Sequence, residues 1–222
     1  MAQPCVPDTL PFVGRQDAPG APPRTVIGIR HGEVHNPDGV IYSGLPGFGL
    51  SELGRSQARA VGEALAGAGI AALYASPLDR AMETAAFIAA ATGAEVVPDE
   101  RLHEWRHWAQ FAGMTWEELR TNGPEAWHAY VNDPGSVTSG ESLAELADRV
   151  EAWERDAVST HADGLIVAVS HLEPLRALLL RKLDRPANDL FYIQIGLGEA
   201  VRLAPEASPS SLTPDALKTA GV

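Results

Sequence analysis

Two histidines each follow, by one intervening residue, a short apolar run that is typical of a buried strand. His31 comes two positions after residues 26–29, with Arg30 beside it, and His171 comes two positions after residues 165–169. In open α/β sheets the ligand crevice lies outside the carboxyl ends of the strands, so both imidazoles are expected at one edge. The sequence therefore predicts a shared site in which a neutral imidazole can act as a nucleophile.

Two arginines are expected at the same edge. Arg30 neighbours His31, and Arg80 falls in the first turn of a helix that follows a third apolar run, residues 70–75. The N–H groups at that helix terminus also favour anions. Two guanidiniums and two imidazoles repel one another unless an anion with several oxygens lies among them. A phosphoryl group meets that need, so the residues favour phosphoryl-transfer chemistry.

The elements that position these residues alternate along the chain. Strands are expected at residues 26–29, 70–75, 95–97 and 165–169, with one or two closing strands within residues 190–204. Helices are expected after Ser51, at Ser76-Pro77, at the capping box of Ser142 and Glu145, and after Pro174. Repeated βα alternation predicts an α/β fold with a mainly parallel sheet covered by helices on both faces.

Residues 102 to about 140 interrupt this alternation. They hold four of the five tryptophans of the chain, which are Trp105, Trp108, Trp116 and Trp127. We expect a small inserted cap whose rings serve packing rather than a ligand cage. The Pro-rich stretches 1–24 and 205–222 are predicted to be flexible tails around a single domain, residues 25–204.

Composition limits the classes of partner. The 222 residues carry a net charge of -12, which excludes the global basic field of a protein that binds nucleic acid or anionic lipid. No apolar run reaches the about 18 residues of a membrane span. The single cysteine, Cys5, allows no intramolecular disulfide. A cytoplasmic protein with no nucleic acid or membrane partner is expected, and its oligomeric state stays open.

Several motifs, in this order along the chain, resemble those of the histidine phosphatase superfamily, which includes the cofactor-dependent phosphoglycerate mutases. The matching pieces are Arg30-His31-Gly32-Glu33, Ser43-Gly44 with residues 50–54, residues 76–85, Leu102-His103-Glu104, Gly140-Glu141-Ser142 and Val169-Ser170-His171. The resemblance covers about residues 25–204. It implies a three-layer α/β/α sandwich with a mainly parallel central sheet.

The resemblance also implies roles. His31 would form a phosphohistidine, and Glu104 would protonate the departing oxygen and then activate water. Such an acid needs a raised pKa, which Trp105 and Trp108 could provide by drying its surroundings. The residues expected to hold the phosphoryl oxygens or the substrate are Arg30, Arg80, His171, Asn36, Ser43, Gly44 and Leu172. No metal or cofactor is expected, and the partner is a small phosphorylated substrate.

Three alternatives remain beside a phosphomonoesterase. Residues 103–107 fit the zinc peptidase signature His-Glu-x-x-His, which requires both histidines on one helix face and a third ligand. A phosphoglycerate mutase would need adjacent arginines in the cap, where only Arg106 and Arg120 occur, apart from each other. A phospholigand-binding domain without turnover is suggested by Leu172-Glu173, which follows His171 where relatives usually have glycine.

Overall fold

The central feature of the computed structural model is one six-stranded sheet. The structure describes residues 25–203 and 211–212, so the predicted leader 1–24 and most of the predicted tail 205–222 lie outside the described residues. The sheet order is β3-β2-β4-β1-β5-β6. β1, β2, β3 and β4 are parallel to one another, β5 runs antiparallel to β1, and β6 runs antiparallel to β5. The strands are β1 Thr25–Arg30, β2 Ile70–Ala75, β3 Val96–Pro98, β4 Leu165–Ser170, β5 Ala200–Arg202 and β6 Ser211–Leu212.

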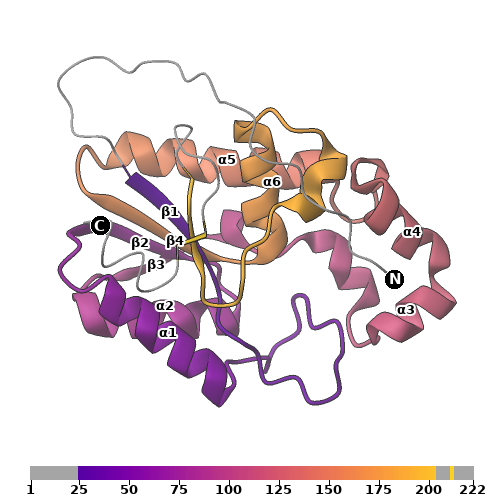
Figure 1. Cartoon of the computed structure of the whole chain (residues 1–222), viewed down its shortest axis with the longest axis horizontal. Helices are drawn as coiled ribbons and strands as arrows, with labels where there is room; N and C mark the ends of the chain where they lie inside the picture. Colours follow the sequence, from indigo (N-terminus) through magenta and orange to yellow (C-terminus); the bar gives the residue numbers. More distant parts are fainter. Residues whose placement is uncertain (1–24, 204–210, 213–222) are drawn as a thin grey trace.

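Helices cover both faces of the sheet. α1 (Glu52–Ala64) and α2 (Asp79–Thr92) lie on one face, and α5 (Leu143–Thr160) and α6 (Leu172–Lys182) lie on the other (Figure 1). Alternate residues of β4 explain the two layers: Ile166 and Ala168 belong to the core beneath α5 and α6, while Val167 packs with the core beneath α1 and α2. The predicted three-layer α/β/α sandwich is therefore confirmed.

The pairing of β1 with β4 places the two strand-ending histidines at the same height. Arg30 pairs with Ser170, and the backbone N–H of His31 donates to the Ser170 carbonyl at 3.0 Å. Because parallel strands end at the same edge, His31 and His171 follow these paired residues side by side.

Two predicted helix starts are correct. Ser51 accepts the backbone N–H of Gly54 at the start of α1, and Ser142 with Glu145 forms the capping box of α5.

Two other helices begin at residues that differ from the prediction. The prediction that Ser76-Pro77 opens a helix is wrong, since α2 begins at Asp79 and its N-cap position, Leu78, has no side-chain cap. α6 begins at Leu172 rather than after Pro174, because proline is tolerated in a first turn, where no N–H partner is needed. α2 follows the end of β2 and α6 follows the end of β4, so the first N–H groups of both helices lie at the carboxyl edge of the sheet.

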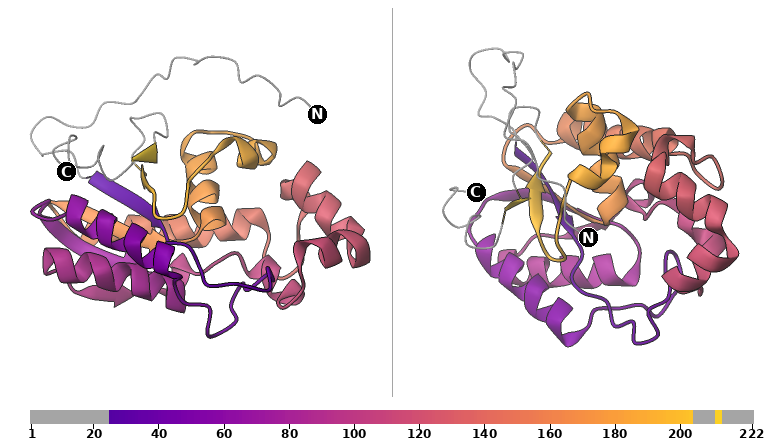
Figure 2. Two further views of the ribbon diagram at one scale, coloured as in Figure 1. Left: turned by 60° about the horizontal axis from the view of Figure 1, so that its bottom comes forward. Right: turned by 45° about the vertical axis from the view of Figure 1, so that its right-hand side comes forward.

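A cap of short helices stands beside the sheet, with α3 (Trp116–Asn122) and α4 (Pro124–Asn132) at its far end (Figure 2). Three 3₁₀ turns complete it: η1 Glu100–Leu102, η2 Arg106–Phe111 and η3 Pro134–Ser136. Trp105 and Trp108 are buried in the core that the cap shares with α5 and α6. The predicted Trp-rich cap insertion is confirmed.

The closing region holds one strand, β5, within residues 190–203, where one or two strands are predicted. Residues Ala187–Tyr192 before it form the 3₁₀ helix η4. Among the described residues, no helix is long and apolar enough to cross a membrane.

Candidate active site

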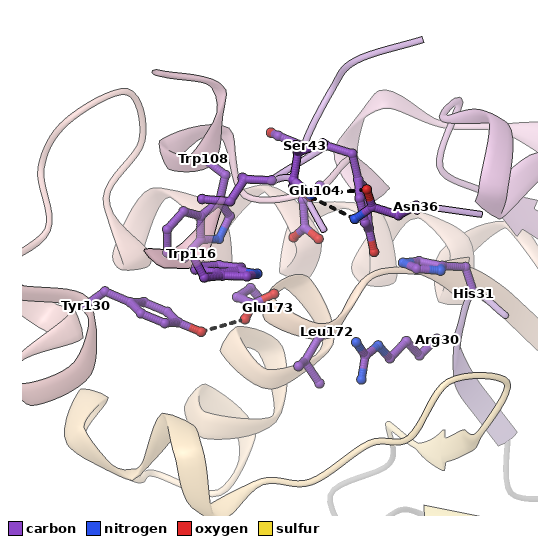
Figure 3. Close-up of a pocket in the computed structure, with 13 residues that line it drawn as sticks. Arg30, His31, Asn36, Ser43, Glu104, Trp108, Trp116, Tyr130, Leu172 and Glu173 are labelled. Carbon is purple, nitrogen blue, oxygen red and sulfur yellow. Dashed lines mark hydrogen bonds between the residues drawn. The ribbon is translucent and has the colours of Figure 1, made fainter. Parts of the chain in front are cut away.

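A pocket of about 270 Å³ opens at the carboxyl ends of β1 and β4 (Figure 3). Six of the residues predicted from the sequence line it: Arg30, His31, Asn36, Ser43, Glu104 and Leu172. Arg80 and His171 do not line the pocket directly. Arg80 contacts the lining residue Tyr42, and His171 contacts His31. Gly44 follows Ser43 and does not line the pocket.

His31 is buried and held in one tautomer. Its Nδ1 lies 2.8 Å from the carbonyl oxygen of Gly32, which can only accept, so Nδ1 carries the proton. Nε2 is then left with its lone pair. Burial, followed by the charge of Arg80, holds the pKa of His31 well below its ordinary value. The ring is neutral at neutral pH, as a nucleophile requires.

Glycine follows His31 because two backbones touch there. A Cβ on Gly32 would lie 2.5 Å from the carbonyl oxygen of Gly54, in the first turn of α1. The N–H of Gly32 donates to Thr84 Oγ1 at 3.2 Å, which ties the same loop to α2. A side chain at this position would push the loop, and His31 with it, away from both helices.

The two arginines are anchored by backbone carbonyls. Arg80, which is 1% exposed, donates from Nη2 to the Ser43 carbonyl at 2.9 Å, and its guanidinium lies 4.7 Å from the centre of the Tyr42 ring. Arg30 donates from Nη1 to the Ile195 carbonyl at 2.8 Å. Each guanidinium is thus fixed in place while part of its hydrogen-bonding capacity is unused.

Unused hydrogen-bonding groups gather at this spot. Six buried polar side-chain atoms in the described part of the chain have no protein partner. Four of them belong to this group: Arg30 Nε, Ser43 Oγ, Arg80 Nε and His171 Nδ1. Buried polar atoms are rarely left unpaired, and three of these four can only donate when His171 is protonated on Nδ1. The arrangement is suited to an anion that accepts several hydrogen bonds.

Ser43 has a strained backbone conformation in addition to its unpaired hydroxyl. Its backbone has φ of 31°, in the left-handed region that a side chain disfavours, although the residue is buried. Local strain of this kind is concentrated at functional sites. The strained turn directs the Ser43 carbonyl onto Arg80 and leaves its Oγ free.

His171 lies between the nucleophile and the acid. Its ring centre is 5.1 Å from that of His31, its Nε2 is 2.8 Å from Ser76 Oγ, and its Nδ1 is 3.8 Å from Glu104 Oε2. Burial and the charge of Arg80 hold the pKa of His171 well below its ordinary value. The ring is a neutral hydrogen-bonding group rather than a cation.

The Glu104 carboxyl has the acidity of a proton donor at neutral pH. Burial first, and then the nearby charge of Glu173, raise the pKa of Glu104 to about 7, against the opposing effect of Arg80. Its Oε1 accepts the backbone N–H of Trp105 at 2.8 Å. Trp105 next to it is fully buried, and Trp108 lines the same pocket as Glu104.

A buried ion pair supports the Glu104 segment from behind. Arg149 donates to both carboxylate oxygens of Glu141, at 2.6 and 2.9 Å, and also to the Glu104 carbonyl at 3.1 Å. The indole N–H of Trp105 donates to the Glu141 carbonyl at 2.9 Å. The Gly140-Glu141-Ser142 motif therefore positions the acid from outside the pocket.

Asn36 lines the pocket with its amide already engaged. Its Nδ2 donates to the Val40 carbonyl at 2.9 Å, and its Oδ1 accepts the Val40 N–H at 3.1 Å. Asn36 therefore closes its own loop, and one amide hydrogen remains for a ligand.

The zinc peptidase alternative lacks the helix that it needs. His103 follows η1 and His107 lies in η2, so the two histidines do not share a face of one α-helix. His107 is buried against Trp108, with Nδ1 hydrogen-bonded to Ser139. No group of three potential metal ligands comes together in the part of the chain that is described.

Several pocket residues are not among the predicted site residues. Tyr42, Trp116, Tyr130 and Glu173 line the pocket. No motif includes Tyr42 or Tyr130, whereas Trp116 belongs to the Trp-rich cap, whose rings are predicted to serve packing alone. The role of Ser76 could have been suspected, because it follows a strand that ends at the same edge.

Most of the chain is similar to known proteins. A model of the histidine phosphatase superfamily (branch 1) matches residues 26–212. An uncharacterised protein of Mycobacterium tuberculosis is 40% identical over 152 residues, which are 68% of this chain and 75% of that protein. Phosphoserine phosphatase 1 of Hydrogenobacter thermophilus is 36% identical over 156 residues, 69% of this chain and 73% of that protein.

A solved structure is also similar. The mycobacterial glucosyl-3-phosphoglycerate phosphatase, in complex with VO3, superposes with a TM-score of 0.73 at 27% identity, covering 81% of this chain and 92% of that chain.

Proposed function

Because this chain belongs to the histidine phosphatase superfamily, we propose that it is a phosphomonoesterase that hydrolyses a small phosphorylated metabolite through a phosphohistidine at His31. The observation that carries the proposal is the state of His31, neutral and with the Nε2 lone pair unused. Beside it lie four polar atoms with no hydrogen-bond partner in the described part of the chain. A nucleophile and an anion site in one small pocket support phosphoryl transfer.

In the first step, Nε2 of His31 attacks phosphorus. The N–P bond forms while the bond from phosphorus to the leaving oxygen breaks, and the Glu104 carboxyl gives its proton to that oxygen. Arg30, Arg80, Nδ1–H of His171 and the backbone N–H of Leu172 hold the other phosphoryl oxygens and stabilise their charge.

In the second step, Glu104 takes a proton from water, whose oxygen attacks the phosphohistidine. The N–P bond breaks, inorganic phosphate leaves, and His31 and Glu104 return to their starting protonation states. A residue with a pKa of about 7 can serve both as the acid and as the base near neutral pH.

A mutase receives less support from the pocket. Neither Arg106 nor Arg120 lines it, and Arg120 is exposed and paired with Glu117. Within residues 25–203, Arg30 is the one arginine that lines the pocket, so no second one is available there to hold a substrate carboxylate. We also propose the cytoplasm as the compartment, which the single cysteine supports.

Phosphate release from p-nitrophenyl phosphate tests the proposal. We expect release that persists in a metal chelator and is lost in His31→Ala. With radiolabelled phosphate monoester, a rapid quench in alkaline detergent should trap an acid-labile, alkali-stable phosphoenzyme in the native protein and none in the variant. Turnover that the chelator abolishes would contradict the proposal, and tight phosphate binding without turnover would favour the binding domain.

A further inference from the structure

The side of the pocket across from His31 is built from aromatic rings and one carboxylate. Trp108, Trp116 and Tyr130 line it together with Glu173. Figure 3 shows Tyr130, Trp116 and Glu173 on one side of the pocket and His31 on the other. We call these four residues the distal wall. A phosphate ester whose phosphoryl group is at His31 would direct its leaving alcohol toward the distal wall.

Glu173 is held in position but not fully used. Its Oε1 accepts the Tyr130 hydroxyl at 3.0 Å and lies 3.6 Å from Nη1 of Arg176. Arg176 is itself tied to the Ile193 carbonyl at 2.7 Å. No hydrogen bond to the other oxygen, Oε2, is found among the described residues. The buried carboxylate therefore has one oxygen available to a donor from a ligand.

The rings of the distal wall add a second preference for positive charge. Trp108 contacts Trp116 and Tyr130 edge to face, with ring centres 5.1 and 4.6 Å apart. Trp116 is 40% exposed, the most accessible of the three. Aromatic faces attract ammonium groups, and the attraction is stronger in a partly dry pocket. A ring surface and a carboxylate that face the same space suit a cation that can also donate a hydrogen bond.

We propose that the distal wall binds the leaving alcohol of the substrate and selects an alcohol that carries an ammonium group. This inference rests on the proposed phosphatase function. The Arg176 charge reduces the attraction without removing it, because Arg176 does not line the pocket while Glu173 does. A leaving alcohol that carries a carboxylate would instead approach Glu173 with a like charge.

Three two-carbon esters test the selection: phosphoethanolamine, ethyl phosphate and phosphoglycolate, which carry an ammonium, no charge and a carboxylate. We expect kcat/KM to fall in that order, with the ammonium ester favoured over the neutral one by about 10-fold, mainly through KM. In Glu173→Gln that ratio should fall toward one. Glu154→Gln is the matched control, since Glu154 is equally buried but pairs with Lys182 outside the pocket, and it should keep the ratio.

Comparing ratios separates selection from acidity, because a changed Glu104 pKa affects all three esters. Binding to the His31→Ala variant, measured by calorimetry, tests the distal wall without turnover, so failure of the phosphatase proposal and failure of this inference are distinguishable. If Glu173→Gln does not fold, Tyr130→Phe, which removes the hydroxyl that holds Oε1, should lower the same ratio. A higher kcat/KM for phosphoglycolate, or for the uncharged-alcohol ester glucose 6-phosphate, than for phosphoethanolamine would overturn the inference. An unchanged ratio in Glu173→Gln would also overturn it.

Discussion

Ser76 and His171 form a buried contact at the carboxyl edge of the sheet, with Ser76 Oγ 2.8 Å from Nε2 of His171. The same hydroxyl accepts the backbone N–H of Leu78 at 3.4 Å, so its own proton is free to go to Nε2. We therefore assign His171 as the tautomer with its proton on Nδ1. Nδ1 lies 3.8 Å from Glu104 Oε2 and has no hydrogen-bond partner among the described residues, which makes its proton a donor for a phosphoryl oxygen.

Ser76→Ala should lower kcat/KM for p-nitrophenyl phosphate by about 10-fold, because losing one buried hydrogen bond leaves the His171 tautomer undetermined. Nitrogen NMR of the imidazole should show the native Nδ1–H form become a mixture. Thr92→Ala, at the far end of α2, removes a hydroxyl bonded only to the local backbone and should change neither measurement. A native spectrum with the proton on Nε2 would refute the assignment, and an unaltered tautomer in Ser76→Ala would refute the role of Ser76.

Glu104 should produce the alkaline limb of the pH profile. An acid must carry its proton, and with a pKa of about 7 the protonated fraction falls as the pH rises through that value. Glu104→Gln should remove the limb and lower kcat/KM by about 100-fold or more. The loss should be larger for ethyl phosphate than for p-nitrophenyl phosphate, whose leaving group needs less protonation. Equal losses for both esters would argue against a proton-donor role.

Glu173→Gln should move the alkaline limb to lower pH. Glu173 is the second cause of the raised Glu104 pKa, after burial, so removing its charge lowers that pKa and the acid loses its proton earlier. Initial rates over a pH series with ethyl phosphate measure the shift. Movement of the limb to higher pH would contradict this electrostatic coupling.

Arg80→Gln should move the acid limb of the profile to higher pH. The nucleophile must be neutral, so activity falls as the pH drops through the pKa of His31. Burial is the main reason for the lowered pKa and Arg80 the second, so removing the guanidinium raises the pKa only in part. We also expect a loss of about 1,000-fold in kcat/KM, since a charge on the transferred group loses its partner. An acid limb that stays in place would exclude the coupling.

Glu141→Gln should destabilise the fold. The Glu141 and Arg149 side chains are 6% and 11% exposed, and breaking such a buried pair leaves an uncompensated charge that costs about 3 kcal/mol in the free energy of unfolding. Urea unfolding measures that change. Glu52→Gln, whose partner Arg55 is half exposed, should have no measurable effect. A native-like midpoint for Glu141→Gln would show that the pair is not structural.

Local patterns were sufficient to predict the framework. Apolar runs before His31 and His171, and polar caps such as Ser51 and Ser142, depend on residues near one another in the chain. The four parallel strands and the starts of α1 and α5 could therefore be predicted directly. Parallel pairing then brings strand ends to one edge whatever the loops do. For that reason the fold class and the meeting of the two histidines were predictable.

Other features depend on residues that are distant in the sequence. The Ser76 hydroxyl binds His171, 95 positions away, instead of capping a helix, and Tyr130 meets Glu173 across 43 positions. The neutral state of His31 and the raised pKa of Glu104 come from burial, which is a property of the packed molecule. The sequence by itself determined which groups could perform chemistry and at which edge. Only the tertiary structure decided their protonation and what lines the pocket opposite His31, because desolvation and cap packing arise from long-range contacts.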